Sequence, residues 1–197
     1  MRLPDTVLSV QPARLPGDSG VWTFIIADLG AFAMFFIVFS AGRMGAPALF
    51  EQSRQHLDIS LGLLNTLILL TSSLFMVRAV NAAQSEARRA VIRNIALTML
   101  IGSGFAVTKV IEYKAKLAAG IGLTTNEFYT YYFAFTGIHF LHFLIGLGAL
   151  SVILIKARAD ALDAKFLIWI ESVGCYWHMV DLLWIMLFPM LYLLRAA

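Results

Sequence analysis

The chain has 197 residues, which suits one compact domain, and a formal net charge of +3. Apolar residue types make up 60% of it and the mean hydropathy is +0.80, whereas soluble domains are roughly 45–50% apolar, so an ordinary soluble domain is excluded. The modest charge, without a dense basic run, gives no indication of nucleic acid as a partner, and the one cysteine, Cys175, excludes a disulfide framework.

The first 20 residues are mixed and polar, and they lack the apolar stretch of a secretory signal peptide. We interpret residues 1–20 as a short cytoplasmic tail at the membrane surface. A helix that crosses a bilayer needs about 20 apolar residues. Five stretches in the remaining domain, residues 21–197, meet this requirement, at about 21–42, 59–80, 92–113, 128–155 and 166–194. The sequence therefore predicts an all-α protein, an integral membrane bundle of five transmembrane helices with short connections.

The distribution of positive charge predicts the orientation of this bundle. With five spans, the N-terminus and the second and fourth connections share one side of the membrane. That side, with its flanks, holds nine lysines and arginines and the other side holds six, which together make up the 15 in the chain. Because cytoplasmic loops carry the excess of lysine and arginine, we expect the N-terminus inside and the C-terminus outside.

Two of the predicted spans contain acidic residues whose setting is informative. Asp28 lies seven residues into the first span, about 10 Å deep at 1.5 Å per residue. It is either a hydrogen-bonded acid that faces the bundle or a site for proton handling or partner contact. Glu112 ends the third span, where we expect an interfacial, partly hydrated acid, with Lys109 extending to the same surface.

The last two spans carry further ionisable residues. His139 and His142 are three apart, and so share one helix face. Glu171 and His178 are seven apart and nearly in line, and Asp181 follows close by on the fifth span. Lipid would leave these groups without hydrogen-bond partners, so the face that carries them must meet protein. The polar stripe therefore predicts helix–helix packing.

Further features bear on packing and on alternatives. His139 and His178 both lie near the membrane midplane, where two facing histidines can bind a haem iron, so a haem-carrying protein stays open. A small transporter is less favoured, because no span is interrupted at its centre. Pro189 predicts a bend near the end of the last helix. Small residues predict close approach of helices at Gly102, Gly104, Gly137, Gly146 and Gly148.

Five blocks of sequence, in order, resemble subunit III of the haem–copper oxidases. They are WTFIIADLGAFAMFF, LLNTLILLTSS, KVIEY, TGIHFLHFLIG and YWHMVDLLW. The chain is similar to only the last five of the seven spans of mitochondrial-type subunit III. It also has Phe140 where the family usually has glycine, and Asp28 where cytochrome c oxidases have glutamate. Five-span forms occur among quinol oxidases and among proteins encoded with nitric oxide reductase, and the FPMLYLL ending is most similar to the latter.

The resemblance implies an accessory membrane subunit without catalytic residues or redox cofactors of its own. Haems and metals would reside in the catalytic partner subunit, and structural lipids would bind between helices. The expected partner is nitric oxide reductase of denitrification, in a bacterial inner membrane; the alternative is a cytochrome c or quinol terminal oxidase of aerobic respiration. Asp28 corresponds to the family's intramembrane acid. Polar packing or lipid-contact positions correspond to Glu112, His139, His142, Glu171, His178 and Asp181.

Overall fold

The computed structural model describes residues 14–159 and 161–194, and every regular element within them is helical. The elements in chain order are α1 (Ser19–Gly45), α2 (Pro47–Arg54), α3 (Ile59–Gln84), α4 (Arg88–Ala118), α5 (Glu127–Ala159), α6 (Ala164–Phe188) and the short π-helix η1 (Pro189–Leu193). Within these described ranges, five helices are long and apolar enough to cross a membrane: α1, α3, α4, α5 and α6 with η1. The all-α prediction with five spans is confirmed.

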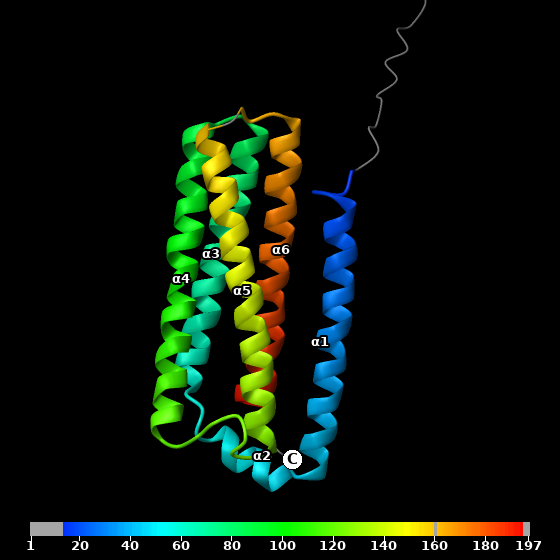
Figure 1. The fold of residues 1–197 in the computed structure, drawn as a ribbon, viewed down its shortest axis with the longest axis vertical. Helices are drawn as coiled ribbons and strands as arrows, with labels where there is room; N and C mark the ends of the chain where they lie inside the picture. The colour runs from blue at the N-terminus through cyan, green and yellow to red at the C-terminus, as the bar shows by residue number, and fades with distance from the viewer. Residues whose placement is uncertain (1–13, 160, 195–197) are drawn as a thin grey trace, which may run out of the picture.

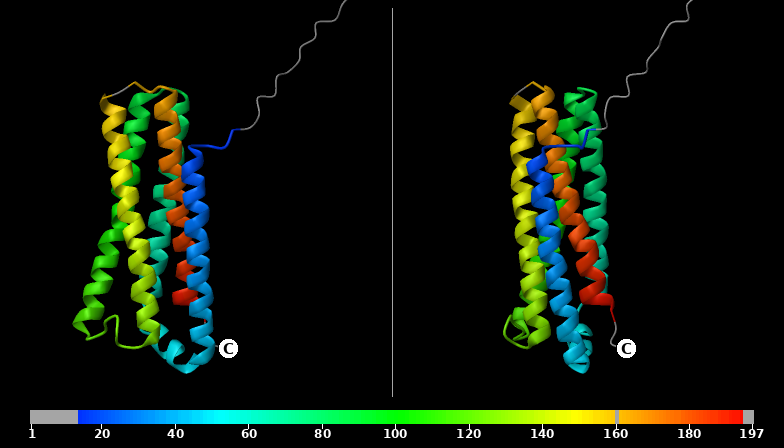
Figure 2. Two further views of the ribbon diagram at one scale, coloured as in Figure 1. Left: turned by 45° about the vertical axis from the view of Figure 1, so that its right-hand side comes forward. Right: turned by 90° about the vertical axis from the view of Figure 1, so that its right-hand side faces the viewer.

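The helices α3, α4, α5 and α6 form a four-helix bundle, and α1 packs on its outside against α5 and α6 (Figures 1 and 2). One end of the molecule holds the start of α1 and the α3–α4 and α5–α6 connections. The opposite end holds α2, the α4–α5 connection and the end of η1 (Figure 1). The connections therefore alternate between the ends as predicted, whereas the orientation in the membrane stays a prediction.

Aspartate side chains mark the beginnings of three spans. Asp18 accepts a hydrogen bond from the backbone N–H of Gly20 at the start of α1, and Asp58 accepts from Ser60 and Leu61 at the start of α3. Asp163 does the same for Phe166 at the start of α6. These side chains satisfy N–H groups that have no partner within the helix, and so they fix where each span begins.

Two short elements refine the predicted boundaries. The stretch 43–58 was expected to be a simple connection, but it contains α2, which starts at Pro47 and buries Phe50 against Phe39 and Phe128. Proline favours the first turn of a helix because it has no N–H to satisfy. At the other end, α6 stops at Phe188 and Pro189 begins η1, because proline interrupts the hydrogen-bond ladder of an α-helix.

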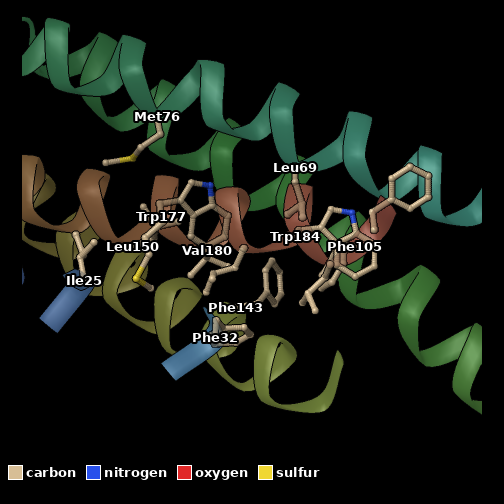
Figure 3. Packing of buried hydrophobic residues seen from close by; sticks show 14 of the residues in the cluster. Ile25, Phe32, Leu69, Met76, Phe105, Phe143, Leu150, Trp177, Val180 and Trp184 are labelled. Atoms are coloured by element: carbon tan, nitrogen blue, oxygen red, sulfur yellow. The ribbon is translucent and has the colours of Figure 1, made fainter. Parts of the chain in front are cut away.

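The centre of the bundle is built around Trp177, which has no exposed surface and points from α6 toward its neighbours (Figure 3). A Cβ atom on Gly102 of α4 or on Gly146 of α5 would lie 2.9 Å from this indole, so both glycines admit the ring. The expectation of close approach is correct there, but it is wrong for Gly137 and Gly148, which face open space. Small residues therefore mark two different surfaces on α5.

Candidate functional site

The predicted site residues lie in separate polar clusters where neighbouring elements of the fold meet. The first cluster joins α1 to α5. Asp28 Oδ1 lies 3.1 Å from His142 Nε2, and the two side chains are only 12% and 13% exposed. His142 Nδ1 also lies 2.8 Å from the carbonyl oxygen of Ile138, one turn earlier. The ring of Phe32 packs edge-on against His142, so aromatic contacts shield the pair. Asp28 therefore anchors α1 to the four-helix bundle.

The second cluster is an ion pair inside the bundle. Lys109 Nζ lies 2.8 Å from Glu112 Oε2, and the side chains are 1% and 4% exposed. The hydroxyl of Tyr192 donates to Glu112 Oε1 at 2.8 Å and accepts from Lys109 Nζ at 3.0 Å. The interfacial, hydrated setting expected for Glu112 and Lys109 is therefore wrong. The reason is that η1 folds its tyrosine over the end of α4 and covers both groups.

Aromatic rings surround this ion pair. Lys109 Nζ lies 4.8 Å from the centre of the Trp184 ring, a cation–π arrangement. His139 packs against the same indole, with ring centres 5.4 Å apart, and is completely buried. Neither ring nitrogen of His139, nor the hydroxyl of Tyr132, has a hydrogen-bond partner among the described residues. These groups are therefore buried in the core without hydrogen bonds, a setting that the sequence spacing did not indicate.

The third cluster is a ladder of polar contacts between α3 and α6. The indole N–H of Trp177 donates to Ser72 at 3.2 Å, and that of Trp184 donates to Thr66 at 3.1 Å. Next to the first of these contacts, Ser73 Oγ lies 2.5 Å from His178 Nδ1. Asp181 is 4% exposed, and its carboxyl oxygens have no partner within 14–159 and 161–194. The predicted stripe on α6 thus faces protein, and α3 supplies hydroxyl partners that the spacing of polar residues did not predict.

The fourth cluster attaches the segment before α1 to α6. Glu171 Oε2 accepts hydrogen bonds from Arg14 at 2.7 Å and from the backbone N–H of Gly17 at 2.9 Å. The backbone N–H of Asp18 donates to the hydroxyl of Ser172 at 2.9 Å. Residues 14–18 of the predicted tail therefore pack on α6, whereas residues 1–13 lie outside the described part of the chain. Glu171 is a docking point for this segment.

A fifth contact, between α2 and η1, fixes the other end of the bundle. Arg54 of α2 binds Glu51 at 2.5 Å and donates to the carbonyl oxygen of Tyr192 at 3.1 Å. The hydrogen bond to Glu51 raises the pKa of Arg54 above its ordinary value, so its charge is permanent. The α2 helix thereby holds η1 in place. This role was not predicted, because residues 43–58 were expected to form only a short connection between the first two spans.

The two histidines considered as a haem-binding pair have different surroundings. His139 lies among Phe105 and Trp184 in the core, whereas His178 lines a groove between α1 and α6. In the described ranges, no group of three or more His, Cys, Asp or Glu side chains is arranged to hold a metal ion. The polar groups are instead distributed as contacts between neighbouring helices.

The fold and these buried contacts define a multi-pass helical membrane protein whose polar groups tie its helices together. A family model described as cytochrome c oxidase subunit III matches residues 17–195. The chain belongs to the cytochrome c oxidase subunit III family. Subunit III is a non-catalytic subunit of haem–copper oxidases.

The similar relatives include subunits of both cytochrome c oxidases and quinol oxidases. Cytochrome c oxidase subunit 3 of Alkalihalophilus pseudofirmus is 28% identical over 179 residues, which cover 90% of this chain and 86% of the relative. Quinol oxidase subunit 3 of Bacillus subtilis is 28% identical over 181 residues, covering 89% and 85%. Heme-copper oxidase subunit I+III of Aeropyrum pernix is 29% identical over 182 residues, covering 89% of this chain but 22% of that relative.

Proposed function

We propose that this protein is the accessory subunit III of a haem–copper terminal oxidase in a bacterial inner membrane. The observation that carries the proposal is the family match over residues 17–195, nearly the whole chain. The relatives described above are named as subunits of cytochrome c or quinol oxidases. These names favour the terminal-oxidase alternative over nitric oxide reductase, which the sequence ending had suggested.

The partner in this proposal is the catalytic subunit, which holds the haems and metals. The name of the Aeropyrum relative joins subunits I and III in one chain, which supports direct contact between the two. In the proposed mechanism, the five spans cover part of the catalytic subunit and order the lipid there. Binding to the folded partner stabilises it by mass action, without electron transfer through this chain.

The proposed roles of the polar residues follow from their contacts. Asp28 with His142, and Glu171 with Arg14, hold α1 and its leading segment on the bundle. Glu112 secures the end of α4, and Asp181 lies within the seam between α3 and α6. We assign these residues to maintaining the surface that meets the partner and lipid. A direct part of Asp28 in proton supply is the alternative role for that residue.

Purification of the tagged protein from its native membranes in mild detergent tests the proposal. We expect a haem-containing subunit I to co-purify, identified by mass spectrometry and by its absorption spectrum, and the complex to consume oxygen. A nitric oxide reductase subunit, with nitric oxide consumption, would instead establish the denitrification alternative. Purification without any haem-containing partner would reject the accessory-subunit proposal. A spectrum that stays with the isolated chain would favour the haem carrier.

A further inference from the structure

The imidazole of His142 makes two polar contacts, one from each ring nitrogen. Nδ1 lies 2.8 Å from the carbonyl oxygen of Ile138, and Nε2 lies 3.1 Å from Asp28 Oδ1. Both distances are within the range of a hydrogen bond. A carbonyl oxygen can only accept, so Nδ1 must carry a hydrogen and donate it. The contact with α5's own backbone therefore selects the tautomer of His142.

This tautomer limits what can join His142 to Asp28. With its hydrogen on Nδ1, a neutral imidazole presents a lone pair at Nε2. An ionised carboxylate also presents only lone pairs, and two such atoms 3.1 Å apart repel each other. One of the two groups must therefore supply a hydrogen. Either Asp28 is a carboxylic acid that donates to Nε2, or His142 is an imidazolium that donates to Oδ1.

The net charge of the pair favours the same count of one hydrogen between the two atoms. With one shared hydrogen the pair is neutral, whereas a carboxylate beside a neutral imidazole has a charge of −1. A carboxylic acid beside an imidazolium has a charge of +1. Both side chains lie in membrane-spanning helices and are only 12% and 13% exposed. An uncompensated charge is costly in such a place, so burial favours the neutral pair.

The neighbouring polar groups do not replace this hydrogen. Tyr176 of α6 donates its hydroxyl to the backbone carbonyl oxygen of His142 at 3.0 Å, so its hydrogen is engaged there. His178 of α6 has its Nδ1 atom 2.5 Å from Ser73 on α3. The second carboxyl oxygen of Asp28, Oδ2, is buried and makes no hydrogen bond with any residue that the structure describes. The pair must therefore provide its own hydrogen.

We propose that Asp28 and His142 form a proton-binding site, in which one proton held between Oδ1 and Nε2 joins α1 to α5. The proton is a structural ligand of this contact, because it supplies the hydrogen bond and keeps the pair neutral. A fixed donor in the same place should substitute for it. The amide N–H of the Asp28→Asn variant can donate to Nε2 without any bound proton. The inference concerns this chain itself and holds whichever respiratory enzyme is the partner.

Spectroscopy of the full chain in detergent micelles at neutral pH counts the proton. Nitrogen-15 NMR shows which ring nitrogens of His142 carry hydrogen, with His142→Gln as the variant that assigns the signals. The infrared carbonyl band that disappears in Asp28→Asn shows whether Asp28 is an acid. We expect either an acid beside a neutral imidazole or a carboxylate beside an imidazolium. A carboxylate beside a neutral imidazole, or an acid beside an imidazolium, would overturn the proposal.

Substitutions test whether the proton holds α1 in place. Cys175 is a built-in reporter, since its Sγ atom lies 3.9 Å from the carbonyl oxygen of Pro16 in the segment before α1. Its labelling by N-ethylmaleimide should follow the fraction of molecules in which α1 has moved away. We expect His142→Leu and Asp28→Leu to label about tenfold faster, the effect of one lost hydrogen bond. Asp28→Asn should label at the original rate.

The matched control is Ser40→Ala, which removes a hydroxyl that bonds only within α1 and should leave the labelling rate unchanged. Slower labelling of Asp28→Asn would show that the original contact is repulsive and holds no proton. Labelling of both leucine variants at the original rate would show that the contact does not hold α1. Either result refutes the inference, whereas the proposed function depends on co-purification with a haem-containing subunit and is tested separately.

Discussion

The ion pair inside the bundle offers a quantitative test of how this fold is stabilised. Replacing Glu112 by leucine leaves the ammonium of Lys109, which is 1% exposed, without its carboxylate. Breaking a buried pair by removing one partner costs about 3–5 kcal/mol, because the remaining charge stays buried. We therefore expect Glu112→Leu to lower the free energy of unfolding by about that amount. Unfolding of the purified chain in mixed detergent micelles, followed by tryptophan fluorescence, measures the change.

The same reasoning predicts that removing the whole network is far less harmful than breaking it. Tyr192 bonds to both charges, so its hydroxyl must be removed with them. The triple variant Lys109→Met, Glu112→Leu, Tyr192→Phe replaces the network by apolar groups of similar size, which is often neutral for buried pairs. We expect it to unfold within about 2 kcal/mol of the original chain. A triple variant as unstable as Glu112→Leu, or a loss below about 1 kcal/mol in that single variant, would refute the argument.

Three further outcomes follow from the described contacts. Gly146→Leu should destabilise the bundle by about 1–3 kcal/mol, because the side chain meets the Trp177 ring, whereas Gly148→Leu, which faces open space, should change thermal unfolding little. His142→Leu should cost about 1–3 kcal/mol by leaving Asp28 unpaired, and faster proteolysis near the start of α1 would report the loosened helix. Asp28→Asn keeps a hydrogen-bonding group, so steady turnover of the complex and its decay should be unchanged; a faster decay would support the proton role instead.

The spans were predictable because the bilayer fixes their length and composition, independently of how the helices pack. The third predicted span ended at residue 113, whereas α4 continues to Ala118, since the lysines that follow residue 113 do not stop a helix. Burial of Lys109 was not predictable, because its cover comes from Tyr192, 83 residues further along the chain. Similarly, the glycines of α5 look equivalent in sequence, and only the placement of Trp177 on α6 separates Gly146 from Gly148.

Asp28 pairs with His142 and Glu171 pairs with Arg14, so both contacts join residues that are far apart in the chain. This separation has a consequence for biogenesis. The contact between Arg14 and Glu171 spans 157 residues, and the helices that receive α1 are the last two to be made. At about 5–20 residues per second, roughly 8–30 s separate synthesis of these two residues. During that interval α1 is already in the membrane without its place in the bundle. Insertion factors or early-bound lipid that shelter Asp28 would therefore act on this first helix before α5 and α6 are made.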